Sequence, residues 1–334
     1  MPPVSESADE RQARRQAVLA AIAGAGPGGV SGERLAERLG CSRASVHRHV
    51  EALRRGGIAI EGGAAGYRLA GEPDLVVPAL VEPRLRPPIA GPLLWLSETG
   101  STNDEATARA RAGAPEGLVV GADHQRAGRG RRGRAWLAAP GDALLVSALV
   151  RPPLSPVEVG PLPLLAAVAV AEALAQVLPE RAGEVGIAWP NDVLVGGRKL
   201  AGILCELSAD QERVSWAVIG IGVNVRAAPA LADARWTPAA LAELGPAPAR
   251  ADLLVALLDA LGRRYRDWLD NGPRGVLAAF AERDALAGRR LTLALEDGPL
   301  DGEALGIDAQ GRLRLRAGGQ ERALAAGEVV RLHT

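Results

Sequence analysis

One lysine is the first candidate for chemistry in this chain. Of 39 lysines and arginines only Lys199 is a lysine, and asparagine occurs at just four positions, 103, 191, 224 and 271. This usage indicates a coding bias against lysine and asparagine, so each lysine or asparagine that is present marks a position where another residue type is inadequate. The planar fork of arginine cannot imitate a compact ammonium charge on a flexible stem. Lys199 is therefore a functional candidate, with chance survival on a solvated turn as the alternative.

The second candidate is a stretch of arginines and glycines between Gln125 and Trp136. Arginines at 129, 131, 132 and 134 alternate with glycines at 128, 130 and 133, which favours neither a helix nor a regular strand. Glycine amides and guanidinium forks in such a loop can grip phosphoryl or carboxylate oxygens. The letters also match the dinucleotide fingerprint, which requires a helix after the glycines. A β-rich run at 143–150 follows instead, so we exclude that fold and keep an anion-binding loop, with a disordered loop or a nucleic-acid patch as the alternative.

Polar residues precede an alanine-rich helix that we expect to end near residue 112. The sequence Ser101-Thr102-Asn103 leads into Asp104 and Glu105, which is typical of a helix N-terminus. Helix capping alone explains these residues. Hydroxyl and amide groups at such a place also suit a polar, uncharged group of a ligand.

Composition limits the classes of protein that fit. The 334 residues are enough for roughly two domains of about 150 residues, and the formal net charge is zero, so affinity for an anion must come from local clusters. Cys41, Cys205 and four scattered histidines offer no zinc spacing. The apolar run 162–178 contains Glu172 and Gln176, which favours a buried helix over a membrane span. We expect a cytoplasmic protein without a metal cluster or membrane contact.

Residues 11–70 predict a DNA-binding module. They carry ten arginines against four glutamates, and we expect helices at 12–23, after Ser31 through 39, and at 43–55. Ser42 is placed to cap the third helix, with Arg43, Ser45 and Arg48 facing outward. A glycine-rich turn between two short strands then predicts a hairpin, so the module is a winged helix-turn-helix. A three-helix interaction module is the alternative.

The rest of the chain predicts an α+β protein with two further domains. Prolines recur through 71–92, which indicates a linker or a loosely packed crossing segment. Residues 93–286 combine strands, a buried helix, a meander from 185 to 207, a further β-run from 214 to 225 and two helices at 250–270 and 274–285. Residues 287–334 contain short β-runs with glycine turns, which is typical of a small closed barrel. The predicted domains are therefore 1–70, 93–286 and 287–334.

Five motifs together resemble the bifunctional biotin-protein ligases that also repress the biotin operon. These are Ser-Thr-Asn at 101–103, Gly-Arg-Gly-Arg-Arg-Gly-Arg at 128–134, Trp-Pro-Asn-Asp at 189–192, Gly-Arg-Lys-Leu-Ala-Gly-Ile-Leu at 197–204 and Gly-Ile-Gly-Val-Asn at 220–224. The resemblance covers nearly the whole chain. It implies a winged helix-turn-helix, a central mixed α/β ligase domain similar to class II synthetases, and a C-terminal SH3-like barrel.

The resemblance also implies roles for particular residues. Lys199, Arg129 and Arg131 would be catalytic, with Lys199 bridging the biotin carboxylate and the α-phosphate of ATP. Biotin would be bound by Ser101, Thr102, Asn103, Gln125, Gly128, Arg129, Gly130, Arg131, Lys199 and Gly202. ATP would be bound by Arg129, Arg131, Arg132, Arg134, Trp136, Asn191, Asp192, Lys199 and Asn224. Operator DNA would contact Ser42, Arg43, Ser45 and Arg48, and no protein metal site is implied.

The implied chemistry explains why no nucleophile motif is present. A carboxylate attacks phosphorus, and then an acceptor lysine attacks the acyl carbon, so the protein needs cations and water exclusion more than a nucleophile. ATP with Mg²⁺ and biotin would be substrates, and the partners would be a biotin carboxyl carrier protein, operator DNA and a second copy of the chain once the adenylate is bound. A DNA-binding sensor without ligase activity and a lipoate-protein ligase remain the alternatives.

Overall fold

The structure is a computed structural model of the chain, and it describes residues 8–55, 58–63, 66–71, 74–230 and 235–333. Contacts between α-carbons divide the chain into two compact units. The first comprises Met1–Arg84 with Trp95–Ser97, and the second comprises Leu85–Leu94 with Glu98–Thr334. Each unit is described by itself.

Up to residue 71, the described part of the first unit has three α-helices and a hairpin. Its elements are α1 (Ala8–Gly24), a short 3₁₀ turn (Gly26–Gly28), α2 (Gly32–Arg38), α3 (Arg43–Arg55) and the antiparallel strands β1 (Ile60–Gly63) and β2 (Gly66–Leu69). Ser31 Oγ accepts a hydrogen bond from the amide of Arg34 at 3.2 Å, so the serine predicted before α2 caps it. The helices and the hairpin follow the predicted order, and α3 has the predicted bounds.

The apolar stripes of these helices form one core. Val46, Val50 and Leu53 of α3 are buried with Val18 and Ile22 of α1. The stripe on α3 has the helical spacing that the sequence showed, because residues three and four apart share one face. The opposite face of α3 therefore remains in solvent.

The described part of the proline-rich segment, residues 74–92, contains short helical elements and buried apolar residues. It contains α4 (Pro78–Val81) and a 3₁₀ turn (Glu82–Arg84). Val76, Val77, Val81 and Ile89 are all at most 3% exposed. Val77 belongs to the same core as α1, α2 and α3, which explains why the first unit continues beyond residue 70 to Arg84. The predicted domain bounds stay a prediction.

A seven-stranded sheet is the frame of the second unit. Its strand order is β3-β4-β5-β9-β8-β7-β6. The strands are β3 (Leu93–Leu96), β4 (Val119–Ala122), β5 (Ala143–Val150), β6 (Val185–Ala188), β7 (Asp192–Val195), β8 (Arg198–Ala209) and β9 (Val214–Asn224). β9 lies in the middle, and its register pairs Gly222 with Leu145 of β5 and with Gly202 of β8. The central strands are buried, as their apolar sequences predict.

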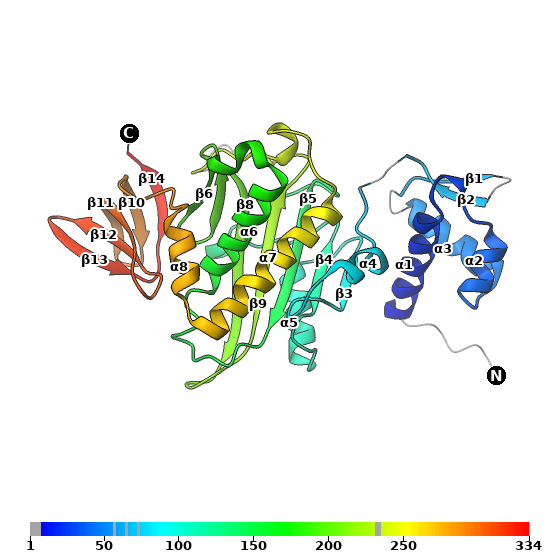
Figure 1. Cartoon of the computed structure of the whole chain (residues 1–334), viewed down its shortest axis with the longest axis horizontal. Coiled ribbons are helices and arrows are strands. Elements are labelled where there is room, and N and C mark those ends of the chain that lie inside the picture. The colour runs from blue at the N-terminus through cyan, green and yellow to red at the C-terminus, as the bar shows by residue number, and fades with distance from the viewer. Residues whose placement is uncertain (1–7, 56–57, 64–65, 72–73, 231–234, 334) are drawn as a thin grey trace. The chain divides into compact units, whose positions relative to one another are not determined.

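Most helices of the second unit cover one face of this sheet, and the candidate site lies on the other face beside one further helix. Figure 1 shows α6 (Leu162–Val177) and α7 (Arg250–Asn271) lying over the sheet, with α8 (Arg274–Ala281) beside them. The predicted buried helix 162–178 is confirmed by α6, whose residues Leu165 to Ala169 are fully buried. The remaining helical elements are α5 (Thr102–Arg111) and short 3₁₀ turns at Arg131–Gly133, Pro179–Glu184 and Leu241–Glu243. Among the described residues no helix is long and apolar enough to cross a membrane.

The C-terminal part of the second unit is a five-stranded antiparallel sheet. Its order is β13-β12-β11-β10-β14. The strands are β10 (Arg290–Leu295), β11 (Gly298–Ile307), β12 (Leu313–Ala317), β13 (Gln320–Leu324) and β14 (Glu328–Leu332). Trp189 Nε1 donates to the carbonyl of Gly311 at 3.1 Å and so joins this sheet to the central one. No described ladder joins β13 to β14, so closure into a barrel stays a prediction.

Candidate functional site

The predicted ligand residues line one cavity of about 540 Å³ in the second unit. Six cationic side chains line it, Arg129, Arg131, Arg132, Arg134, Lys199 and Arg235, against two carboxylates, Asp192 and Glu328. All of the predicted ligand residues are in this lining except Gly128, which lies at the base of the arginine loop. The site therefore has a strong local excess of positive charge in a chain of zero net charge.

Glycines on the central strands let side chains lie directly on the sheet. A β-carbon at Gly222 would lie 2.5 Å from Trp136 Cε2, and one at Gly202 would lie 2.9 Å from Trp136 Cζ3. A β-carbon at Gly220 would collide with the Asn103 amide. Positions 220 and 222 share one face because side chains alternate along a strand. The motif Gly-Ile-Gly-Val-Asn thus provides the bare floor on which Trp136 and Asn103 lie.

One end of the cavity is a cradle of neutral polar groups. Gln125 Oε1 accepts hydrogen bonds from the Thr102 amide at 2.7 Å and from Thr102 Oγ1 at 3.0 Å. Ser101, Thr102 and Asn103 are each 4% exposed. Ser101 occupies the N-cap position of α5, but its side chain makes no capping hydrogen bond, so capping does not explain it. Gln125, from a distant segment, caps the helix instead.

Ser147 on β5 supports this cradle, and our sequence analysis did not find it. Its hydroxyl lies 2.8 Å from Thr102 Oγ1 and 2.7 Å from Asn103 Oδ1, and the residue is fully buried. Asn103 Nδ2 donates to Glu206 Oε2 at 2.7 Å and to the Leu204 carbonyl at 3.2 Å, so the amide is held on both sides. A lone hydroxyl within the otherwise apolar strand Ala143–Val150 was the available signal.

The arginine loop is a small hairpin with a tight tip. The amide of Gly130 donates to the Arg134 carbonyl at 2.6 Å, and that of Trp136 donates to the Gly128 carbonyl at 2.9 Å. A 3₁₀ turn forms the tip at Arg131–Gly133, and Arg132 has φ +54° there. This left-handed conformation costs a non-glycine residue roughly 1–2 kcal/mol. The structure confirms that no helix follows the glycines, which excludes the dinucleotide fold.

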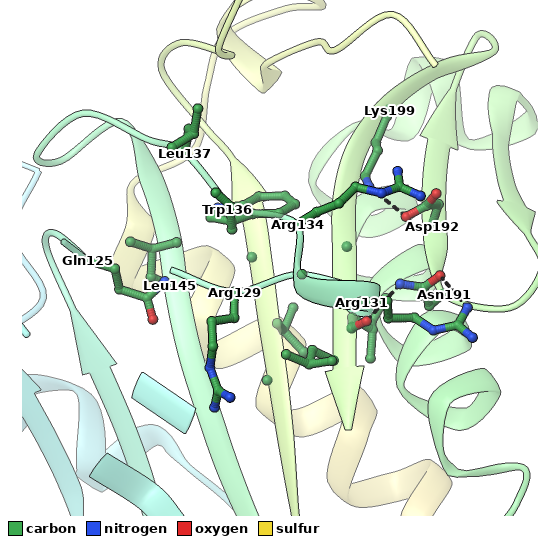
Figure 2. A pocket seen from close by; sticks show the side chains of 18 of the residues that line it. Gln125, Arg129, Arg131, Arg134, Trp136, Leu137, Leu145, Asn191, Asp192 and Lys199 are labelled. Atoms are coloured by element: carbon green, nitrogen blue, oxygen red, sulfur yellow. Dashed lines mark hydrogen bonds and ion pairs between the residues drawn. The ribbon is translucent and has the colours of Figure 1, made fainter. Parts of the chain in front are cut away.

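The loop sends its arginines in two directions. Arg129 Nη2 lies 2.6 Å from Asp104 Oδ1 and 3.0 Å from Glu206, at the end of the cavity beside α5. Arg131 and Arg134 lie on the other side, toward Asn191 and Asp192 (Figure 2). Arg131 Nη1 lies 3.3 Å from Asn191 Oδ1, and Arg134 forms an ion pair with Glu328. Arg132 Nη1 donates to the Ala294 carbonyl at 3.2 Å, so β10 and β14 both hold the loop.

The second end of the cavity concentrates charge around Lys199. Its Nζ lies 2.7 Å from Asp192 Oδ1 and 5.7 Å from the centre of the Trp136 ring. Burial lowers the pKa of Arg131, neighbouring Arg132 lowers it further, and Asp192 opposes the shift. Cations that repel each other at close range in a half-buried cavity are suited to hold anionic groups.

Two polar atoms of residues predicted to bind ATP have no hydrogen-bond partner, and neither do Arg235 Nε and Trp236 Nε1 of the same lining. Asn224 Nδ2 donates to the Ala239 carbonyl at 3.1 Å, while its Oδ1 and the indole Nε1 of Trp136 are buried and unpaired. A buried polar group without a partner costs about 1–3 kcal/mol. Both atoms belong to residues that the resemblance assigns to the nucleotide, and both would gain a partner from a polar ligand.

Three charged or aromatic lining residues from distant segments were not predicted from the sequence. Arg235 and Trp236 lie in the loop after β9, and Glu328 begins β14. Arg235 contacts both Asp192 and Glu328. No local pattern marks any of the three, because each is brought to the site by the fold of the second unit.

The first unit presents the predicted DNA-contacting residues, with one correction. Ser42, Arg43 and Arg48 are exposed. Ser42 Oγ accepts a hydrogen bond from the Ser45 amide at 3.1 Å and so caps α3. Ser45 was predicted to face outward, but it is 8% exposed, because it lies beside Val46 and four residues before His49, which are both buried. The exposed His47, whose Nδ1 lies 3.4 Å from the Tyr67 hydroxyl of the wing, shares the outward face instead.

Comparison with known families first defines the class of each part. Residues 98–224 match the model described as the biotin/lipoate A/B protein ligase family. Residues 14–68 match an HTH domain, and residues 287–332 match the biotin protein ligase C-terminal domain. The chain thus combines a ligase core of this class with a helix-turn-helix domain and a C-terminal domain.

Individual relatives then identify the family. The bifunctional ligase/repressor BirA of Bacillus subtilis is 34% identical over 313 residues, which cover 91% of this chain and 94% of the relative. The biotin–[acetyl-CoA-carboxylase] ligase of Mycobacterium tuberculosis is 38% identical over 269 residues, which cover 78% of this chain and 98% of the relative. The structure of a biotin protein ligase from Aquifex aeolicus in complex with biotin and ATP matches with a TM-score of 0.61 and 26% identity, covering 72% of this chain and 98% of that one. The chain belongs to the family of bifunctional biotin-protein ligases and repressors.

Gly222→Ala should damage the site without unfolding the protein. The new methyl group would push the Trp136 ring off the sheet, because 2.5 Å is far closer than a real β-carbon contact. Displacement by about 1 Å can cost roughly 100-fold in rate, so we expect adenylate formation to fall on that order. Gly183→Ala is the matched control, since a β-carbon there meets nothing within 4 Å. Equal pyrophosphate release from both variants would contradict the packing argument.

Lys199→Arg should harm adenylate formation nearly as much as Lys199→Ala. The ammonium lies between Asp192 and the Trp136 ring, where a wider planar fork does not fit the same place. We expect a loss of roughly 100-fold or more, measured as biotin-dependent pyrophosphate release. Release at the wild-type rate from the arginine variant would show that a point charge is not needed here.

Proposed function

We propose that this chain activates biotin with ATP and transfers it to a lysine of a biotin carboxyl carrier protein. The same chain would repress biotin-synthesis genes with biotinyl-adenylate as corepressor. The observation that carries the proposal is the division of one cavity into a neutral polar cradle and a cationic end. Biotin has a neutral ring system and an anionic carboxylate, and ATP brings phosphates, so the two ends match the two substrates.

In the neutral cradle Ser101, Thr102, Asn103 and Gln125 would hold the polar ring of biotin. Their burial and mutual hydrogen bonds preorganise donors and acceptors before the ligand arrives. Gly128, Gly130 and Gly202 would allow the ligand close to the backbone. Arg129, which is already held by Asp104 and Glu206 beside the cradle, would lie next to the biotin chain.

At the cationic end, Lys199 and Arg131 would hold the biotin carboxylate against the α-phosphate. A carboxylate oxygen forms a bond to phosphorus while the bond from that phosphorus to the bridging oxygen of pyrophosphate breaks, and pyrophosphate leaves with the electron pair. The cations offset the charge of the reactants and of the transition state. The acceptor amine then attacks the acyl carbon, and AMP leaves.

The nucleotide would occupy the space bounded by Trp136, Asn191, Asp192 and Asn224. The unpaired Asn224 Oδ1 and Trp136 Nε1 would gain partners there. Arg132 and Arg134 would meet the outer phosphates. Mg²⁺ would arrive bound to those phosphates, as it commonly does in ATP-dependent enzymes.

The assay that tests the proposal compares two acids. The protein is incubated with ATP, Mg²⁺ and either biotin or lipoate, and acyl-adenylate and pyrophosphate are measured. We expect both products with biotin and little of either with lipoate. Preference for lipoate would favour a lipoate-protein ligase, and biotin binding without pyrophosphate would favour a DNA-binding sensor without ligase activity.

The Arg131→Gly variant should release biotinyl-adenylate into solution before the biotin is transferred to the acceptor lysine. Arg131 Nη1 lies 3.3 Å from Asn191 Oδ1 and so connects the arginine loop to the other side of the cavity. Without this contact, the loop would no longer exclude water from the biotinyl-adenylate, which is a mixed anhydride. We expect the variant to label bystander lysines on an unrelated protein, detected by avidin blotting. Arg126→Gly is the matched control, because its 68% exposed side chain pairs with Glu98 outside the cavity. Equal retention of the adenylate by both variants would show that the arginine loop does not close the cavity over the adenylate.

DNA binding should be coupled to the binding of biotinyl-adenylate, because the bound adenylate would favour the dimer that binds the operator. The excess of positive charge in residues 11–70 is modest, so a single module would bind weakly and with strong salt dependence. A two-fold dimer could place Arg43 and Arg48 of two copies on a palindromic operator. Adenylate bound to the loop arginines could favour the dimer through differential affinity for that state. The protein would act in the cytoplasm, on its own biotin-synthesis promoter.

Footprinting and sedimentation test this coupling in parallel. Both are run with and without biotin plus ATP at one fixed salt concentration. We expect occupied operator and dimer to appear together when the adenylate forms. Equal operator affinity in the two states, or tight binding by a strict monomer, would separate the two functions.

A further inference from the structure

The buried carboxylate of Asp192 is shared by two cations in the second unit. Lys199 Nζ lies 2.7 Å from Oδ1, while the guanidinium of Arg235 binds Oδ2. The Asp192 side chain is 2% exposed, so water does not solvate its charge. A buried carboxylate of this kind is tolerable only when cations or hydrogen bonds compensate it.

This arrangement creates a conflict for the proposed chemistry. Lys199 cannot bind Asp192 fully and also bridge the biotin carboxylate and the α-phosphate. When the ammonium moves to the substrates, Asp192 loses one of its two cations. Removing one partner from a buried ion pair is costly because it leaves an uncompensated charge. A second cation that stays in place lowers the free energy needed to release the lysine.

Arg235 is fixed from several directions and can serve as that cation. Its Nη1 donates to the Val329 carbonyl at 2.6 Å and lies 3.3 Å from Glu328 Oε1. Its guanidinium carbon lies 5.6 Å from the centre of the Trp236 ring, and its side chain is 12% exposed. Burial lowers the pKa of Arg235, and Asp192 raises it. Contacts with β14 and with Trp236 therefore hold the guanidinium beside Asp192 whether or not Lys199 is there.

We infer that Arg235 is a positioning residue for adenylate formation, which it supports by holding the Asp192 carboxylate while Lys199 moves to the reacting groups. The inference rests on the proposed function and deepens it. It also gives the C-terminal sheet a part in the reaction, because Glu328 and Val329 of that sheet anchor Arg235. Glu328 pairs with Arg134 as well, so one carboxylate links the anchor of Asp192 to the arginine loop.

Arg235→Gln tests the inference directly. The amide keeps polarity but removes the charge, so Lys199 becomes the only cation bound to Asp192 and is harder to release. We expect the rate of biotin-dependent pyrophosphate release to fall at least tenfold. Biotin affinity measured by calorimetry without ATP should fall less than this rate, because the hydrogen-bond partners of the cradle at Ser101 to Asn103 do not include Arg235 or Asp192. Arg235→Lys should recover part of the rate, since it restores the charge.

Arg314→Gln is the matched control. Arg314 also belongs to the C-terminal sheet and forms an ion pair, with Glu321 at 2.6 Å, but it lies outside the cavity lining. We expect wild-type rates from this variant. If Arg314→Gln slows adenylate formation as much as Arg235→Gln, general weakening of the C-terminal sheet explains the loss and the inference is wrong.

A double-mutant cycle with Asp192→Asn separates positioning from a general structural role. In the asparagine background there is no buried charge to compensate, so Arg235→Gln should change the rate by less than threefold. An equal loss from Arg235→Gln in both backgrounds would overturn the inference. A wild-type protein that makes no biotinyl-adenylate would instead contradict the proposed function, whereas active wild type with fully active Arg235→Gln contradicts only this inference.

Discussion

The site depends on mutual repulsion among cations that the fold brings into one half-buried cavity. Six cationic side chains and two carboxylates line it. Without ligand, the carboxylates of Asp192 and Glu328 offset part of that repulsion through Lys199, Arg235 and Arg134. Anionic substrates would complete the compensation, so the same charge that strains the free protein supplies binding and transition-state stabilisation. This balance explains how a chain of zero net charge can bind two anions.

The sheet makes this concentration of charge possible because its central strands carry glycines, which have no side chain, where ligands and aromatic rings lie. Gly202, Gly220 and Gly222 let Trp136 and Asn103 approach the backbone, and the hairpin of the arginine loop ends beside them. β5, β8 and β9 thereby set the distance between the neutral cradle and the cationic end. The rigid sheet supports the neutral cradle, while loops from several segments form the cationic end of the cavity.

The sequence predicted the elements that have strong local patterns. The third helix of the first unit follows from apolar periodicity, strand β5 and the buried helix α6 follow from continuous apolar runs, and Lys199 follows from the avoidance of lysine elsewhere. Side-chain direction near a helix end does not follow from residue spacing alone, so the predicted outward direction of Ser45 is wrong and Ser101 makes no capping hydrogen bond. Arg235 could not be found, because its partners Asp192 and Glu328 are 43 and 93 residues away. Such residues become neighbours only when the chain folds, and local patterns in a single sequence do not predict contacts over these separations.

The central claim is that a biotin carboxylate oxygen attacks the α-phosphate and that the protein supplies charge and position but no nucleophile. Oxygen-18 in the biotin carboxylate tests it most directly. After activation and complete transfer to a carrier-protein lysine, AMP and pyrophosphate are analysed by mass spectrometry. The account predicts one labelled oxygen in AMP and none in pyrophosphate, because the bridging oxygen of the mixed anhydride remains with phosphorus when the amine attacks carbon. Unlabelled AMP, or label in pyrophosphate, would contradict it.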